Sequence, residues 1–144
     1  MNLDELRNIY GECELIQGKV IVKSNLHDII KFSVNNYSFN MLKSITAIDL
    51  GDGLELQYKL YSTENEEEVT LAIKVHDEAE TVTDIFDSAV ADENEIYDMF
   101  GVNFIGNKNL KRLYMPENWE GFPLRKDYVQ DDTRLVWNDN SNNA

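Results

Sequence analysis

The sequence predicts a two-layer α+β domain in which helices pack on one face of a mixed, mainly antiparallel sheet. Residues 54–60 and 69–75 alternate between apolar and polar side chains, as strands with one buried face do. Residues 3–10 and 26–37 carry their apolar side chains at helical spacing instead. A length of 144 residues suits one such domain. The predicted order is α-β-β-α-β-β-β, followed by one more helix and a long irregular C-terminal segment.

The N-terminal part is expected to form a helix and a hairpin. The stripe of apolar residues in 3–10 has the period of an amphipathic helix, which ends near Gly11. Residues 13–24 then alternate on both sides of Gly18, which predicts a short two-stranded hairpin. A second helix follows the hairpin.

Three strands are expected after this second helix. Asn25 is a plausible N-cap for the helix at 26–37. Alternating runs at 42–50, 54–62 and 68–76 are then joined by short connections rich in glycine or charge. Short connections join strands that are neighbours, so these three strands should form an antiparallel meander.

A third helix is expected before Gly101, which suits a left-handed residue at a helix C-terminus. Thr83, Asp84 and Ser88 are its candidate N-caps. The apolar face of this helix includes Ile96.

Two carboxylates, those of Asp92 and Glu93, border that apolar face. Three interpretations stay open. The carboxylates lie at the solvent border, or they reach basic groups such as Arg112 and Arg125, or they belong to an interface.

The charge of the chain is unevenly distributed. The formal net charge is −14, and all of it comes from residues 1–100. These residues hold 7 of the 13 Lys and Arg and 21 of the 27 Asp and Glu. An acidic body disfavours nucleic acid and anionic membrane surfaces as partners. Residues 101–126 carry a net charge of +3. This basic cluster is either a solvated face, an internal clamp on the acidic body, or a docking surface.

Composition also limits the cofactors and the location of the chain. A single cysteine, Cys13, and two distant histidines, His27 and His76, do not make an iron–sulfur cluster or a soft-ligand metal site. No apolar run reaches the roughly 20 residues of a membrane span, and the N-terminus lacks the basic start of a signal peptide. We therefore expect a cytoplasmic chain whose redox cofactors, if any, belong to partners.

The segment after Gly101 has little regular periodicity but is rich in aromatic residues. Seven of the fifteen aromatic residues lie between Tyr97 and Tyr128. Long irregular segments in compact domains are either functional or disordered, and disordered segments contain few aromatic residues. This one should be ordered by packing.

Two runs within residues 82–128 form a recognisable signature. The signature positions are Glu93, Glu95, Asp98, Phe100, Gly101, Phe104, Gly106, Leu110, Arg112, Gly121, Pro123, Leu124, Arg125, Lys126, Asp127 and Tyr128. This pattern resembles the C subunits of respiratory complex I, the proton-pumping NADH:quinone oxidoreductases, and their relatives in membrane-bound energy-converting nickel–iron hydrogenases. Three positions depart from it, because Asn94, Asn107 and Phe122 stand where the family usually has arginine, histidine and histidine. Loss of both histidines argues that the motif serves shape and docking and not acid–base chemistry.

The resemblance implies a structural subunit that holds no cofactor. Such a protein lies in the cytoplasmic arm, peripheral to the inner face of the membrane, against the large subunit of an ion-translocating electron-transfer complex and near an iron–sulfur subunit. Iron–sulfur clusters, with either a nickel–iron centre or a quinone, would then belong to the partners. The implied division is an α+β domain at 1–100, a partner-docking segment at 101–137 and a disordered tail at 138–144.

The resemblance also suggests which residues dock. Aromatic residues and arginine are enriched at interface centres, and a glycine and a proline can preset the turn between them. The expected docking residues are Glu93, Glu95, Asp98, Arg112, Trp119, Phe122, Pro123, Leu124, Arg125, Lys126, Asp127 and Tyr128.

Alternatives remain at this stage. The short free-standing chain and its altered motif lean toward a hydrogenase-type assembly, although nothing in the sequence excludes a quinone-type one. Asp92, Glu93, Glu95 and Asp98 could form a carboxylate site for a divalent cation or for acid–base catalysis. Helical geometry disfavours this site, since Glu95 and Asp98 should point away from Glu93. A stand-alone acidic binding module is the third possibility.

Overall fold

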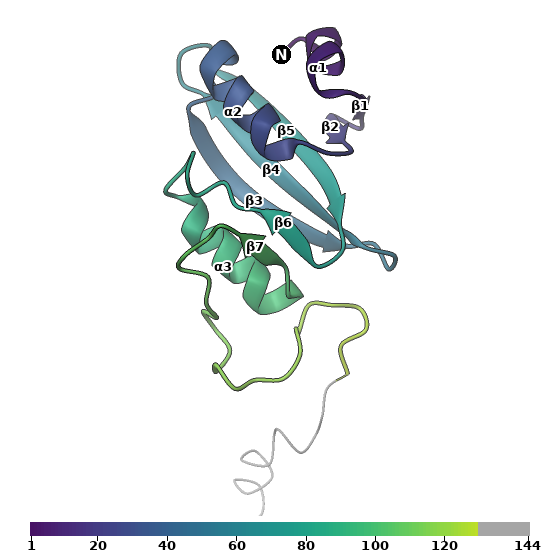
Figure 1. The fold of residues 1–144 in the computed structure, drawn as a ribbon, viewed down its shortest axis with the longest axis vertical. Coiled ribbons are helices and arrows are strands. Elements are labelled where there is room, and N and C mark those ends of the chain that lie inside the picture. The colour runs from purple at the N-terminus through teal and green to yellow at the C-terminus, as the bar shows by residue number, and fades with distance from the viewer. Residues whose placement is uncertain (130–144) are drawn as a thin grey trace, which may run out of the picture.

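The computed structural model describes residues 1–129 and has a five-stranded sheet, a two-stranded sheet and three helices within that range (Figure 1). Its elements, in chain order, are α1 (Leu3–Tyr10), β1 (Cys13–Ile16), β2 (Lys19–Val22), α2 (Leu26–Tyr37), β3 (Met41–Asp49), β4 (Leu54–Ser62), β5 (Glu67–Val75), β6 (Glu78–Glu80), α3 (Ala89–Phe100) and β7 (Asn103–Ile105).

The larger sheet has the strand order β1-β2-β5-β4-β3. Strands β3, β4 and β5 form the predicted antiparallel meander, and β1 and β2 form the predicted hairpin. Strand β2 runs parallel to β5, with Val20 opposite Leu71, so the sheet is mixed. The predicted α+β layout is confirmed.

The core lies between this sheet and the helices on one of its faces. Strand β4 alternates as the sequence predicts, with Leu54, Leu56, Tyr58 and Leu60 fully buried. Helix α2 crosses β4 and β5, while α3 packs against the edge strand β3 (Figure 1). Burial of aliphatic side chains of this size stabilises the fold by about 2 kcal/mol each.

Some local predictions differ from the structure. The apolar stripe of residues 3–10 is only partly packed, since Leu6 is buried whereas Ile9, in the same stripe, is 52% exposed. Asn25 and Ser88 do occupy N-cap positions, yet neither side chain accepts a hydrogen bond from its helix. These helices begin without a side-chain cap, and their buried residues include Ile29 and Ile30 in α2 and Ile96 in α3.

The small sheet was not predicted. Strand β7 runs parallel to β6 just after the helix, with Ala79 opposite Phe104. Backbone hydrogen bonds extend the pairing at both ends, from Asn103 N to Asp77 O at 2.8 Å and from Thr81 N to Ile105 O at 2.9 Å. The segment that begins at residue 101 is thus tied to the strand before α3.

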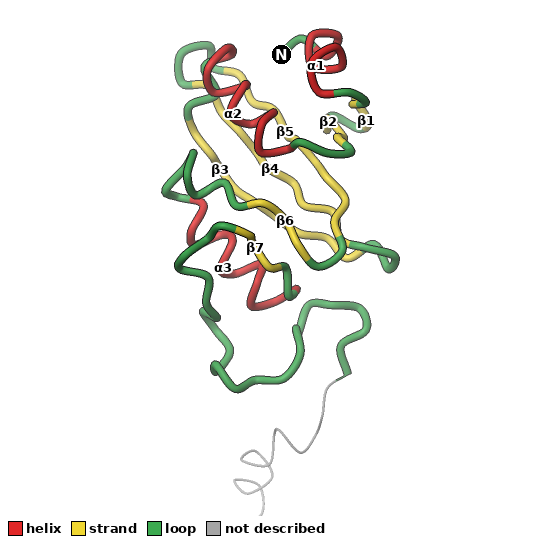
Figure 2. The backbone as a smooth tube through the Cα atoms, in the orientation of Figure 1, coloured by secondary structure: helices red, strands yellow, loops and turns green. Residues whose placement is uncertain are grey.

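Residues 106–129, here named the C-terminal ribbon, contain no helix or strand and run past the end of α3 (Figure 2). The predictions for residues 130–137 and for a tail at 138–144 fall outside the described residues. Within residues 1–129, no helix is both long and apolar enough to cross a membrane.

Candidate docking surface

Asp98, near the end of α3, organises the first half of the ribbon. One carboxylate oxygen, Oδ2, accepts the backbone N–H groups of Leu113, Tyr114 and Met115 at 3.2, 2.7 and 3.1 Å. The other, Oδ1, accepts Arg112 Nη1 at 2.9 Å. Burial raises the pKa of Asp98, but these hydrogen bonds outweigh it and hold the pKa below its usual value. Asp98 is therefore a fixed carboxylate at the root of the ribbon.

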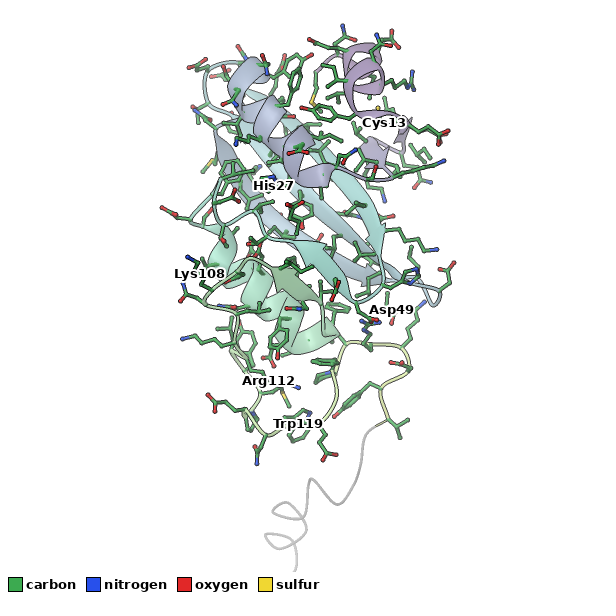
Figure 3. All side chains as sticks on the ribbon, in the orientation of Figure 1. Cys13, His27, Asp49, Lys108, Arg112 and Trp119 are labelled. Carbon is green, nitrogen blue, oxygen red and sulfur yellow. The ribbon has the colours of Figure 1, made fainter. Side chains whose placement is uncertain are left out.

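Arg112 extends this network into the second half of the ribbon. Its Nη2 atom donates to the carbonyl oxygens of Trp119 and Gly121 at 3.0 and 2.9 Å. Its guanidinium also lies over the Phe122 ring, 5.0 Å from the ring centre, a cation–π contact. One guanidinium group thus closes residues 112–122 into a loop, and Figure 3 shows Arg112 and Trp119 together below α3.

Gly101 makes room for the ribbon at the end of α3. Its φ of +76° is left-handed, as predicted, and its N–H donates to Tyr97 O at 2.9 Å. A Cβ atom at this position would lie 2.5 Å from two carbon atoms of the Phe122 ring. The Phe122 ring also packs against Tyr97, with ring centres 6.3 Å apart. Only glycine permits this close approach.

Arg125 attaches the far part of the ribbon to the body. Its Nε atom donates to Phe100 O, and its Nη2 atom donates to His76 O at 3.2 Å and to Asp77 Oδ1 at 3.4 Å. Carbonyls at a helix C-terminus carry partial negative charge, so a cation there is favourable. The charged groups of the predicted basic cluster therefore include an internal clamp on the acidic body.

Two backbone contacts flank this clamp. The Leu124 N–H donates to Met99 O at 3.0 Å, and the Lys126 N–H donates to Asp49 Oδ2 at 2.8 Å. The hydrogen bond from Lys126, followed by one from Gly51, lowers the pKa of Asp49. Figure 3 shows Asp49 at the end of the sheet that faces the ribbon.

Glu93 connects α3 to the small sheet. Its oxygens accept Val82 N–H at 2.8 Å, the Thr81 hydroxyl at 2.7 Å and the Asn107 side-chain amide at 2.8 Å. Burial raises the pKa of Glu93 above its usual value, although these hydrogen bonds oppose the rise. Glu93 is fully buried and lies at neither the solvent border nor the basic groups. The two expectations that placed it there are wrong.

The remaining carboxylates of α3 point elsewhere. Asp92 Oδ2 accepts the Ile45 N–H of the edge strand β3 at 3.2 Å, whereas Glu95 is exposed. Glu95 and Asp98 do not share the contacts of Glu93, as helical geometry predicted, and the four carboxylates do not converge on one point. Among residues 1–129, no group of three or more His, Cys, Asp or Glu side chains is placed to hold a metal ion.

The three departures from the family signature have defined contacts. Asn94 is buried and its Oδ1 accepts Lys111 N–H at 3.1 Å. Asn107 donates to Glu93, and its own Oδ1 accepts Asn109 N–H at 2.9 Å. Phe122 fills the space beside Gly101. All three shape the ribbon.

The predicted docking residues thus fall into three sets. Glu93 and Asp98 are fully buried and bonded to their own chain. The half-buried set is Arg112, Trp119, Phe122, Pro123, Arg125 and Tyr128, and the exposed set is Glu95, Leu124, Lys126 and Asp127.

Sequence reasoning missed other exposed apolar side chains of the ribbon. Tyr114 is 68% exposed, and Leu113 and Val129 are exposed as well. Leu124, which was predicted to dock, is 55% exposed. A cavity of about 500 Å³ opens between the ribbon and the body, with Phe122 and Val129 on the ribbon side and Asp77 and Gly101 on the body side. Isolated apolar residues within an irregular run have no period, so no pattern distinguished exposed from buried ones.

Comparison with known proteins assigns the family. Residues 20–134 match the family described as the respiratory-chain NADH dehydrogenase, 30 Kd subunit. The chain belongs to this family. The C subunit of the NADH-quinone oxidoreductase of Geobacter sulfurreducens is 31% identical over 131 residues, which are 86% of this chain and 78% of that protein. The J subunit of the NAD(P)H-quinone oxidoreductase of Prochlorococcus marinus is 34% identical over 129 residues, 81% and 73% of the two chains. The predicted resemblance is confirmed.

Two further matches are to part of a longer protein and to a solved structure. The C/D subunit of the NADH-quinone oxidoreductase of Phocaeicola vulgatus is 36% identical over 94 residues, which are 62% of this chain but only 18% of that longer protein. A chain in the structure of the membrane-bound sulfane sulfur reductase, an archaeal respiratory membrane complex, has the same fold. That chain aligns with a TM-score of 0.74 at 22% identity, over 96% of this chain and 89% of its own.

Proposed function

We propose that this member of the 30 Kd subunit family is a cofactor-free structural component of a membrane-associated, ion-translocating electron-transfer complex. It docks on the large catalytic subunit through the C-terminal ribbon and helps to assemble the cytoplasmic arm beside an iron–sulfur subunit. The observation that carries the proposal is an irregular segment whose backbone is fixed by Asp98, Arg112 and Arg125 while its apolar side chains face outward.

Fixing the backbone in advance favours binding. A loop that is ordered before docking loses little conformational entropy on docking, so more of the contact energy remains as affinity. Exposed Tyr114, together with half-buried Trp119 and Arg125, has the composition of an interface centre. Glu93 and Asp98 act indirectly in this proposal, since they position the ribbon without reaching its outer surface.

The identity of the partner is supported by the relatives. The Phocaeicola vulgatus protein is named as a C/D subunit, so a C-type sequence there shares one chain with a D-type one. Fusion of two subunits is easiest when they lie side by side in the complex. We therefore take the D-type large subunit, or its nickel–iron counterpart, as the partner of the ribbon.

The type of complex is a choice between two assemblies. The names of the relatives favour a quinone-reducing complex, whereas the altered signature positions Asn94, Asn107 and Phe122 lean toward a hydrogenase-type one. Metal analysis and electron paramagnetic resonance of the native complex distinguish them. Nickel beside iron–sulfur centres identifies the hydrogenase type, and quinone reduction without nickel identifies the other.

Co-purification with the large subunit tests the docking proposal. The double variant Leu113→Ala/Tyr114→Ala removes two exposed ribbon side chains and keeps the backbone N–H groups that bind Asp98. The matched control is Leu15→Ala/Ile16→Ala, which removes two exposed apolar side chains from β1. We expect the ribbon variant to fold and to lose most of the large subunit, while the control keeps it. Equal recovery of the large subunit by both would show that docking does not depend on these ribbon side chains, and absence of the large subunit from the wild-type preparation would favour a stand-alone binding module.

A further inference from the structure

A second apolar feature lies beside the ribbon, in a groove between β3 and α3. The groove has a volume of about 230 Å³, and its apolar lining comes from Ile45, Ala47, Ile96, Met99, Phe100 and Leu124. Strand β3 is an edge strand of the large sheet, so this groove opens at the side of the molecule. The ribbon contributes one wall through Leu124, and the groove is therefore continuous with the proposed docking surface.

The groove is held open by polar contacts on both sides. Asp92 Oδ2 accepts the Ile45 N–H at 3.2 Å, which fixes the distance between α3 and the edge strand. The Leu124 N–H donates to Met99 O at 3.0 Å, which fixes the ribbon wall. Bound side chains would meet a preformed site.

The charge at the rim indicates what kind of segment would fit. Glu95 lines the groove and is exposed, and its carboxylate makes no hydrogen bond or ion pair with the residues 1–129 that the structure describes. Asp92, one turn before Glu95 on α3, adds a second carboxylate beside β3. Asp49 lies further along β3, where the positive charges of Arg125 and Lys126 act on it. Such a rim complements a positive charge next to an apolar side chain.

We propose that this groove receives a segment of the large subunit that inserts an apolar side chain between β3 and α3 and pairs an adjacent lysine or arginine with Glu95. The inference rests on the proposed function for the identity of the partner. It adds a second contact of defined chemistry, which meets the outward face of the ribbon at Leu124.

Photocrosslinking in the native complex tests the placement. A benzoylphenylalanine residue replaces Thr46, an exposed residue at the groove, and a second sample carries it in place of Glu64, in the turn between β4 and β5. Mass spectrometry identifies the linked peptide. We expect position 46 to link to a peptide of the large subunit with a lysine or arginine within about four residues of the linked site, and position 64 to give no such product. A link from position 46 to a second copy of this chain or to another subunit, or no link at all, would overturn the inference.

Charge reversal tests the pairing. Glu95→Lys should weaken binding of the large subunit about fivefold, since it replaces an attraction at the rim by a repulsion. Glu64→Lys changes the net charge equally and should leave binding unchanged. Reversal of the basic residue in the linked peptide to glutamate should restore binding of the Glu95→Lys variant.

The two proposals fail in different ways. If the ribbon variant loses the large subunit while Glu95→Lys binds as tightly as the wild type, the ribbon proposal stands and the groove inference is wrong. If both variants bind normally, docking through this end of the molecule is wrong altogether.

Discussion

Arg112 Nη1 lies 2.9 Å from Asp98 Oδ1, in an ion pair whose two side chains are 9% and 0% exposed. The pair joins the last turn of α3 to the C-terminal ribbon. Each partner also binds backbone groups of the ribbon, so the pair fixes the path of the chain as well as balancing a buried charge.

Replacement of Asp98 by asparagine should destabilise the protein. The change leaves Arg112 without its buried counter-charge, and loss of one partner of a buried pair costs about 3–5 kcal/mol. Urea unfolding at neutral pH measures the free energy of unfolding. Asp87→Asn, at an exposed position, serves as the control and should change it by less than about 0.5 kcal/mol. A loss of under about 1 kcal/mol in the Asp98→Asn variant would show that the pair is dispensable.

The same variant should show a defined pH dependence. Since the pKa of Asp98 is lowered in the folded protein, its stabilising contribution is present above the ordinary carboxyl pKa of 3.8 and is lost as the pH falls through the lower folded pKa. The difference in unfolding free energy between wild type and Asp98→Asn should thus be largest near neutral pH and shrink below pH 3.8. A constant difference over this range would contradict the assignment.

Gly101→Ala should destabilise the end of α3 for two reasons. The left-handed φ strains alanine, and the new Cβ atom meets the Phe122 ring at 2.5 Å. We expect a loss of about 2–4 kcal/mol in thermal or urea unfolding. Gly51→Ala is the control, because its φ of +91° is similar but nothing lies within 4 Å of a Cβ there. It should lose only about 1 kcal/mol, and equal losses would show that contact with Phe122 does not matter.

Position 107 should tolerate another neutral side chain that donates a hydrogen bond to Glu93, but not a side chain with a negative charge. Asn107→Asp places a carboxylate where the amide now donates to Glu93 at 2.8 Å, and like charges this close are strongly unfavourable. Asn107→His keeps a donor and should be milder. The Asn107→Asp defect should lessen as the pH falls and Glu93, whose pKa is already raised by burial, becomes protonated. Denaturation at several pH values measures this, and a pH-independent defect would argue against the pairing.

Arg125→Ala should release the ribbon without unfolding the sheet. Loss of hydrogen bonds to Phe100 O and His76 O removes about 1–2 kcal/mol of local stability, which raises opening about tenfold. Chymotrypsin should then cut after Tyr128 about ten times faster, while circular dichroism stays unchanged. Lys126→Ala is the control, since that residue binds Asp49 through its backbone N–H. Equal cleavage rates for the two variants would contradict the clamp.

Strands and helices with regular periods were predictable. Strand β4 was predicted with its observed bounds, and α1 and α2 likewise, because apolar side chains at a period of two or 3.6 residues determine which face is buried. Strands β6 and β7 were missed, since each has three residues and their pairing depends on α3 bringing the two segments together.

The motif drew attention to Glu93 and Asp98 but did not predict what they bind. Their partners are backbone and side-chain groups 11 to 17 residues away in irregular segments. No local sequence pattern predicts such contacts. Both carboxylates were therefore expected at an interface, whereas they hold the ribbon from within.

Hydrogen–deuterium exchange of the chain alone and in its native complex tests the central claim most directly. We expect peptides covering residues 113–129 to gain protection in the complex, while peptides covering β1 and β2 at the far end of the sheet change little. Unchanged exchange in residues 113–129, with new protection at β1 and β2, would show that the partner binds elsewhere and that the ribbon is not the docking surface.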